Sequence, residues 1–281
     1  MGNHYVPQYY LKGFSADGGE TVWAYDKADR RVYRAHTRNV ATQTRFYSAD
    51  LESYLANSVE DPAKPVIEKI RARVQISIQE KQTLAAYMIC MMNRVPEGKK
   101  RTKLRAPSVK DEVIADIDRR LNVFLRQNPH QAELVEKRRS ETHELIERYA
   151  KDAPDDLWFR TILRAKQSQV LPLLSSMTWR FLTFDRYPAF ITSDNPVFFF
   201  TENGLVSPDS ELSFPISSHV SLWATHRSDF QDGFSATTEQ AVKELNRRTA
   251  SRATRFAFHS IEEPWVMTLL TRRSPQLHLF R

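Results

Sequence analysis

Apolar residues follow a different period in each third of the chain, and no other feature constrains the fold more. Residues Thr21–Tyr33 alternate apolar and polar side chains on either side of DKADR, which predicts a β-hairpin. From residue 48 to residue 176 the apolar side chains recur at helical spacing. From residue 177 onward, short runs rich in β-branched and aromatic residues predict strands, with one helix near Thr237–Arg248. The order of these periods predicts an α+β fold.

The strand-rich ends and the helical centre define the architecture that we expect. Residues 1–47 and 177–281 are predicted to form one mixed or antiparallel sheet, with the helical segment 48–176 packed against it. A chain of 281 residues can bury a large core, and we expect a single globular domain over residues 1–281. The bulky N-terminal segment His4–Phe14 is expected to be docked into this fold, because an undocked terminus frays.

Cap and turn residues place the boundaries of the expected elements. Ser48 or Asp50 is predicted to cap the first helix. An apolar helix over Lys81–Asn93 is expected to end at Pro96 and Gly98, and Ser108 to cap the next helix. Further helices are expected over about Gln131–Lys151 and Asp155–Leu174. The strands expected after residue 177 are TWRFLTF, AFITSD, PVFFF, SFPIS, HVSLWAT, TRFAFHS and WVMTLL.

The composition excludes several classes of protein. Hydrophobic residues make up 41% and charged residues 27% of the chain, which is typical of folded soluble domains. The single cysteine, Cys90, lies in the apolar run LAAYMICMM, so an internal disulfide is excluded and a buried thiol is predicted. The sequence has no secretory pattern at its start and no run of about 20 apolar residues, so we expect a cytoplasmic protein that does not cross a membrane.

The chain is basic, with a formal net charge of +7, and two runs carry much of the excess. RVPEGKKRTKLR, residues 94–105, holds six basic residues and one acid, and NRRTASRATR, residues 246–255, holds four arginines and no acid. Such runs suit a polyanion such as nucleic acid, because each neutralised phosphate releases counterions. A solvated surface is the alternative. The candidate substrate contacts in these runs are Lys99, Lys100, Arg101 and Arg247.

The common signatures of cofactor sites and nucleophiles are absent, including the P-loop, the zinc-ligand spacings and the nucleophile elbow. Three short stretches are left as candidate sites. The first holds His4 and Gln8 on either side of a Val-Pro step; a core histidine is the alternative. The second is FITSDNPV, where Asp194 and Asn195 end a strand and either present a carboxylate to a metal or form an Asx turn.

The third stretch is the first helical segment, in which Glu52 and Glu60 are eight residues apart. This spacing is a little over two turns, so both carboxylates lie on roughly the same face and can share a site. Ordinary surface glutamates are the alternative. Arg94, from the end of the apolar helix, and Asn246, from the late helix, can each reach a central site or cap a helix.

Several of these stretches, in this order, resemble a known family. HYVPQYYLKGF, VWAYDK, the helix with Glu60, the NR pair that ends in Arg94, and FITSDNPV are similar to bacterial proteins of the domain of unknown function family 4238. The resemblance covers nearly the whole chain but implies no assigned activity. Family members usually have a PLSP element after the aspartate stretch, where this chain has FPISS. The polar set that the resemblance implies is His4, Gln8, Glu60, Arg94, Asp194, Asn195 and Asn246. Polar residues that recur together from distant segments commonly converge on one pocket.

These residues predict a metal-dependent nuclease or phosphodiesterase. Glu60 and Asp194, with His4 as a further ligand or acid–base group, would hold Mg²⁺ or Mn²⁺, and Arg94 would contact the phosphate. The nucleic acid substrate would be bound by Gln8, Asn195, Asn246, Lys99, Lys100, Arg101 and Arg247. Two alternatives stay open. One is a non-catalytic module that binds nucleic acid or protein; the other is a metal-free hydrolase or transferase with Asp194 or Glu60 as general base and a nucleotide-like substrate.

Overall fold

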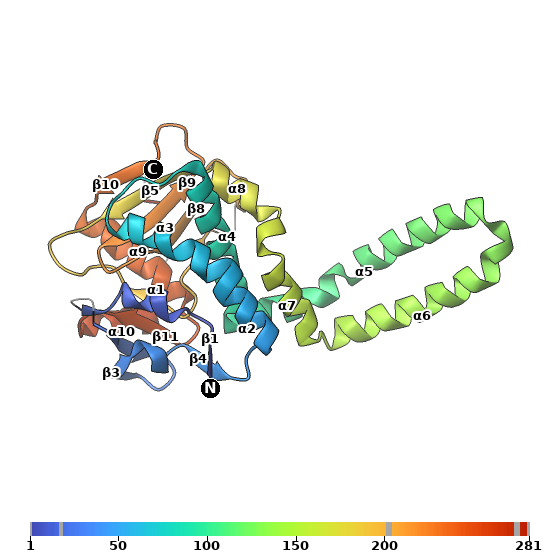
Figure 1. Cartoon of the computed structure of the whole chain (residues 1–281), viewed down its shortest axis with the longest axis horizontal. Helices are drawn as coiled ribbons and strands as arrows, with labels where there is room; N and C mark the ends of the chain where they lie inside the picture. Colours follow the sequence, from blue (N-terminus) through green and yellow to red (C-terminus); the bar gives the residue numbers. More distant parts are fainter. Residues whose placement is uncertain (1, 17–18, 201–203, 273–275, 280–281) are drawn as a thin grey trace. The chain divides into compact units, whose positions relative to one another are not determined.

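The computed structural model describes residues 2–16, 19–200, 204–272 and 276–279 (Figure 1). The chain divides into two compact units. Unit 1 comprises Met1–Pro96 and Leu163–Arg281, and unit 2 comprises Glu97–Ile162. Both strand-rich ends of the chain belong to unit 1, and unit 2 lies wholly within the predicted helical centre. The single domain expected over residues 1–281 stays a prediction.

Within its described residues, unit 1 contains three sheets. The first has the strand order β3 (Arg31–His36), β2 (Thr21–Asp26), β11 (Phe256–His259) and β6 (Thr192–Ser193). The second has the order β10 (Gly233–Ala236), β5 (Thr178–Thr183), β9 (Val220–Thr225), β8 (Glu211–Pro215) and β7 (Phe198–Phe199). In the third, β1 (Gly2–His4) pairs with β4 (Thr42–Thr44). Only β10 and β5 pair in parallel among these described strands.

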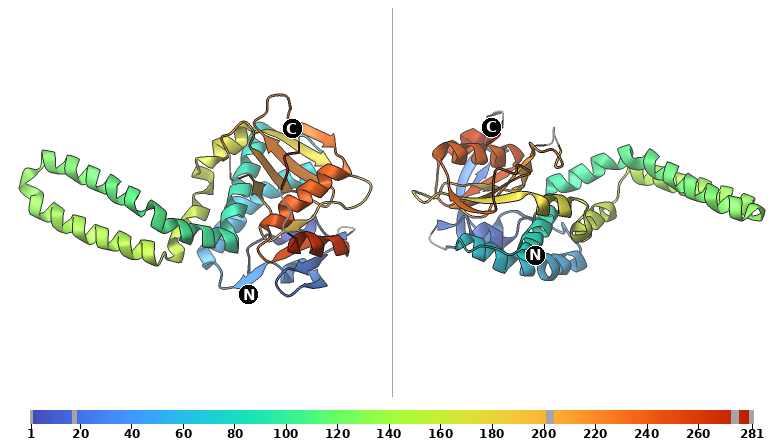
Figure 2. Two further views of the ribbon diagram at one scale, coloured as in Figure 1. Left: turned by 180° about the vertical axis from the view of Figure 1, so that it is seen from behind. Right: turned by 90° about the horizontal axis from the view of Figure 1, so that it is seen from above.

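The α+β fold is confirmed, and the two ends of the chain do share a sheet, because β2 pairs with β11, with β3 and β6 at the two edges (Figure 2). The expectation of one sheet is wrong, since the strands are divided among three. Pro196 accounts for one division. It lies between β6 of the first sheet and β7 of the second, and a residue without an N–H cannot extend the ladder of β6.

A long helical segment follows β4. It consists of α2 (Ala49–Tyr54), the π-helical segment η3 (Leu55–Glu60) and α3 (Asp61–Arg71), with no break between them. Ser48 caps its start as predicted, since the Ser48 hydroxyl accepts the N–H of Leu51 at 3.3 Å. The next helix, α4 (Ile78–Arg94), is buried along most of LAAYMICMM, which confirms the buried helix and the buried thiol of Cys90.

Unit 2 is made of α5 (Pro96–Gln127), the turn η4 (Pro129–Gln131), α6 (Ala132–Lys151) and most of α7 (Asp155–Leu163). The apolar helix ends just before Pro96, as predicted, but the predicted break at Gly98 and the predicted cap at Ser108 are wrong. α4 ends at Arg94, but α5 begins at Pro96 and continues through Gly98 and Pro107. Proline fits the first turn of a helix because the N–H that it lacks would have no partner there. The Ser108 hydroxyl donates to the carbonyl of Arg105 inside this helix.

Two other expected elements differ from those observed. WVMTLL, predicted as a strand, lies in α10 (Pro264–Thr271), where Pro264 again takes the first turn. The helix expected over Asp155–Leu174 is divided into α7, η5 (Ala165–Gln167) and α8 (Val170–Ser176). The helix expected near Thr237–Arg248 is confirmed as α9 (Glu239–Arg252). No helix in the described ranges is long and apolar enough to span a membrane.

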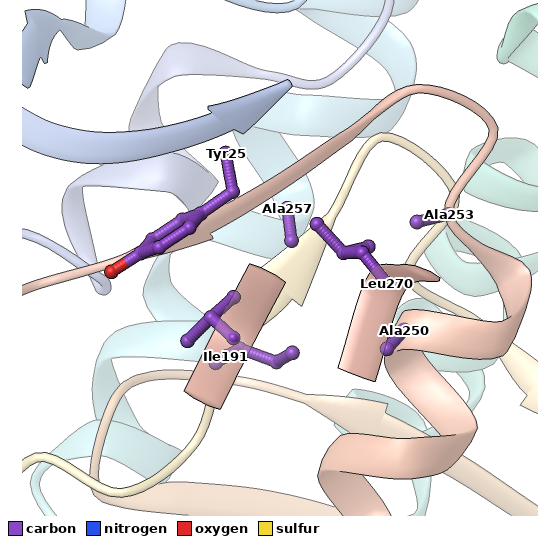
Figure 3. Close-up of a cluster of buried hydrophobic side chains, with 7 residues drawn as sticks. Tyr25, Ile191, Ala250, Ala253, Ala257 and Leu270 are labelled. Atoms are coloured by element: carbon purple, nitrogen blue, oxygen red, sulfur yellow. The ribbon is translucent and has the colours of Figure 1, made fainter. Parts of the chain in front are cut away.

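Helices α9 and α10 pack on the first sheet (Figure 3). The side chains of Tyr25 from β2, Ala257 from β11, Ala250 from α9 and Leu270 from α10 are buried in one apolar cluster with Ile191. This packing fixes α9 and β11 relative to β6. These three elements carry or contact the last three members of the polar set, Asp194, Asn195 and Asn246.

Candidate functional site

The N-terminal segment is docked into unit 1, as predicted. Tyr5, Val6, Tyr10 and Leu11 are buried, and the last two lie in the short helix α1 (Gln8–Lys12). The Tyr10 hydroxyl donates to the carbonyl of Pro215 at 2.7 Å. In β1, His4 is opposite Thr42 of β4. The backbone around His4 therefore has a fixed position.

Arg94 joins this N-terminal segment to the helical segment. Its side chain is 1% exposed; Nη1 donates to Glu60 Oε1 at 2.7 Å, and Nη2 donates to the carbonyl of His4 at 2.7 Å. The guanidinium lies over the ring of Tyr47, at 5.8 Å from its centroid. Arg94 Nε is buried and has no hydrogen-bond partner within the described residues. The side chains of Glu60 and Arg94 and the backbone carbonyl of His4 thus meet at one place.

Glu52 and Asn3 complete this group. Asn3 accepts the N–H groups of Phe46 and Tyr47 and lies 3.4 Å from Glu52 Oε2 through its amide nitrogen. Burial raises the pKa of the Glu52 carboxyl; the negative charge of Glu60 raises it further, while Arg94 opposes the rise. We call Asn3, His4, Glu52, Glu60 and Arg94 the Arg94 cluster.

The π-helical segment brings Glu52 and Glu60 closer to one face of the helical segment. In a uniform α-helix of 3.6 residues per turn, residues eight apart are about 80° out of line. The segment Leu55–Glu60 lies between the two carboxylates and has i→i+5 hydrogen bonds, so its turns are wider and this offset is smaller. π-Helical segments occur frequently at functional sites.

The histidine of the cluster has a defined tautomer when it is neutral. His4 Nε2 lies 3.1 Å from the carbonyl oxygen of Arg38. A carbonyl only accepts, so Nε2 carries the proton and Nδ1 keeps its lone pair. No partner for Nδ1 is present in the described part of the chain. Nδ1 is therefore available to accept a proton.

Asp194 is engaged elsewhere. Its carboxylate is 1% exposed and accepts three backbone N–H groups, from Thr254 and Arg255 at 2.7 Å and from Phe256 at 3.0 Å. Burial raises its pKa to about 6 in spite of these hydrogen bonds. Asp194 fastens the start of β11 to the end of β6. Neither a hydrogen bond nor an ion pair joins it to Glu60 in the described chain.

In the described ranges, no three His, Cys, Asp or Glu side chains are placed to hold a metal ion together. The pair of Glu60 and Asp194 as ligands of Mg²⁺ or Mn²⁺ stays a prediction.

The amide side chains of the polar set bind backbone from distant segments. Asn246 accepts the N–H of Ile191 at 3.1 Å and donates to the carbonyl of Ala189 at 2.7 Å. Asn195 donates to the carbonyl of Arg252, and Gln8 donates to the hydroxyl of Thr37. The set that the family pattern brings together is thus divided: part of it forms the Arg94 cluster, and the rest fixes loops to each other.

The basic run of residues 246–255 does not present a uniform cationic face. Arg248 is fully buried and pairs with Glu211 at 2.7 Å, and Arg255 pairs with Asp26 at 2.6 Å. Arg252 donates to the carbonyl of Phe199. Arg247 is 39% exposed and lies 3.3 Å from Glu244, and Arg255 is 47% exposed.

The basic run at the start of α5 is part of unit 2. Lys99 pairs with Asp155 at 2.6 Å and lies over the ring of Trp158. Lys100 and Arg101 are exposed. Nucleic acid as a partner stays a prediction.

The sequence did not predict Asn3 and Tyr47 as residues of the site, nor Glu211 as the buried partner of Arg248. Asn3 adjoins His4 in the sequence, which is a usable signal. Glu211 lies in β8 and shows no pattern of its own, because its partners Arg248 and His278 are far along the chain.

Comparison with known proteins gives one family. Residues 3–263 match the family described as protein of unknown function (DUF4238). No curated protein and no solved structure matches the chain.

Proposed function

Because the chain belongs to the DUF4238 family, whose description assigns no activity, we propose a function from the Arg94 cluster alone. The protein is proposed to be a hydrolase or transferase that uses acid–base catalysis on a small, nucleotide-like substrate. The observation that carries the proposal is the convergence of Glu52, Glu60 and His4 around Arg94, from elements that are distant in the sequence.

The carboxylates of the cluster are in different environments. Glu60 is ion-paired with Arg94, whereas Glu52 is half-buried and has only a weak contact with Asn3. The raised pKa of Glu52 lets it hold a proton at higher pH than an ordinary glutamate. Such differences between neighbouring carboxyl groups commonly distinguish the acid from the base in active sites.

Each residue has a proposed role. Glu52 donates a proton to the leaving group, and His4 Nδ1 accepts a proton from the attacking water or hydroxyl. Arg94 is a positioning residue, because its guanidinium is buried and donates to Glu60 and to the carbonyl of His4. Removing it would leave Glu60 without its ion pair and the His4 carbonyl without this donor.

The test is a turnover assay with ATP, NAD⁺, cyclic AMP, bis-p-nitrophenyl phosphate and short DNA and RNA oligonucleotides. We expect wild-type turnover of at least one small substrate, unchanged by EDTA. Glu52→Gln should lower kcat about 10²- to 10⁴-fold, the usual contribution of a general acid or base. The matched control is Asp50→Asn, an exposed carboxylate on the same helix.

The pH profile gives a second readout. Glu52 must be protonated to act as an acid, so the rate should fall as pH rises through its raised pKa. The residual rate of Glu52→Gln should lack this limb. Full activity in Glu52→Gln contradicts the proposal. Activity that requires Mg²⁺ or Mn²⁺ would favour the metal-dependent nuclease instead.

A further inference from the structure

A cavity of about 340 Å³ lies in unit 1 apart from the Arg94 cluster. Its walls come from β5, β10, the first half of α9 and residues 277–279 near the C-terminus. None of the predicted site residues except Arg247 lines it. The volume is in the range of pockets that hold small organic molecules.

One side of the cavity is apolar. Leu182, Phe230 and Leu279 line it, and all three also belong to or pack against a buried cluster around Trp223 and Leu245. This side is therefore rigid, because its residues are held by the core behind them. It suits an apolar or aromatic part of a ligand.

The rest of the lining is polar and rich in hydrogen-bond donors. The hydroxyl groups of Ser235, Thr237 and Thr238 line it together with Gln240, at the start of α9. Thr238 caps the helix by accepting the N–H of Ala241. The N–H of Gln240 has no partner in the helix, as at every helix start, and favours a negative charge nearby.

Among the charged side chains described around the cavity, one arginine is not paired with a carboxylate. One buried carboxylate, Glu244, lines the cavity and is paired with Arg247 at 3.3 Å. A second, Glu211, contacts the lining residue His278 and is paired with Arg248 at 2.7 Å. Arg180 also lines the cavity, and its guanidinium donates to the carbonyl of Gln231 at 3.3 Å. No carboxylate pairs with Arg180 in the described residues. Its charge is thus available to a ligand.

We propose that this cavity is a binding site for a small organic anion with an apolar body, and that Arg180 binds the anionic group. The apolar side takes the body of the ligand, and the donors at the start of α9 take further oxygen atoms. The site is separate from the Arg94 cluster and does not depend on the activity proposed for it.

The test uses two probes that share an aromatic body and differ in charge. They are 8-anilinonaphthalene-1-sulfonate, an anion, and the neutral N-phenyl-1-naphthylamine. Fluorescence titration of the full chain should show one saturable site for the anion. Arg180→Gln should weaken binding of the anion about tenfold or more, as expected for one charge-assisted hydrogen bond, and leave the neutral probe unchanged.

Two variants control the result. Arg186→Gln removes a nearby exposed arginine that does not line the cavity, and it should change neither titration. Ala241→Phe fills the cavity from α9 and should abolish the site for the anion while circular dichroism stays unchanged. Absence of a saturable site in the wild type, or unchanged binding of the anion in Arg180→Gln or in Ala241→Phe, overturns the proposal.

Discussion

Replacing Glu60 with alanine tests the buried ion pair at the centre of the Arg94 cluster. The Arg94 side chain is 1% exposed and that of Glu60 is 20% exposed. Removing one partner leaves a buried charge unpaired, which costs about 3–5 kcal/mol. The wild-type Glu60 side chain is partly exposed to solvent, and in the variant Arg94 keeps its hydrogen bond to the carbonyl of His4. We therefore expect the lower end, a loss of about 3 kcal/mol in the free energy of unfolding.

The assay is urea unfolding followed by circular dichroism, with thermal unfolding beside it. At about 2 °C per kcal/mol for a chain of this length, Tm should fall by about 6 °C. Asp61→Ala is the matched control, since Asp61 is the next residue and its pair with Lys64 is exposed at both ends, 55% and 42%. The control should lose less than about 1 kcal/mol. Equal losses in the two variants would refute the buried pair.

Three further predictions concern other buried or strained positions. The pKa of Asp194 is raised from its ordinary value near 3.8 to about 6, so the native state holds a proton that the unfolded state has lost. The contribution of this group to the free energy of unfolding therefore falls as pH rises from about 4 to 6. Over this range the wild type should lose roughly 3 kcal/mol relative to Asp194→Asn, as measured by urea unfolding. A difference between the two proteins that does not change with pH would contradict this. Burial raises the pKa of the Cys90 thiol to about 12, so a disulfide reagent should label it only after denaturation. Pro107→Ala should restore the hydrogen bond to the carbonyl of Lys103 and stabilise α5 by about 3 kcal/mol, seen as slower amide exchange in this helix.

Much of the fold could be predicted because it depends on local patterns. The hairpin of β2 and β3, the capped start at Ser48 and the buried helix through Cys90 follow from periodicity and caps. The errors occur where a local rule has two outcomes. Glycine can break a helix or lie inside one, and Gly98 lies inside α5; an apolar run such as WVMTLL fits a strand or a helix equally.

The candidate site could be predicted only in part, because its members find partners over long distances. The eight-residue spacing placed Glu52 and Glu60 together, but the π-helical segment that aligns them has no sequence signal that we recognised. Asp194 was grouped with Glu60, yet its carboxylate is held by N–H groups about 60 residues further along the chain. The motif TSDNP does not predict which backbone N–H groups the carboxylate binds.

The pKa of Glu52 is the measurement that tests the central claim most directly. Selective ¹³C labelling of glutamate, with the signal assigned by Glu52→Gln, allows its carboxyl to be titrated by NMR in the wild type and in Glu60→Gln. We predict a wild-type pKa above the ordinary value near 4.5, and a fall in Glu60→Gln, because that variant removes the negative charge beside Glu52. An ordinary pKa in the wild type, unchanged by Glu60→Gln, would mean that the two carboxyl groups do not share a site and would contradict the proposed active site.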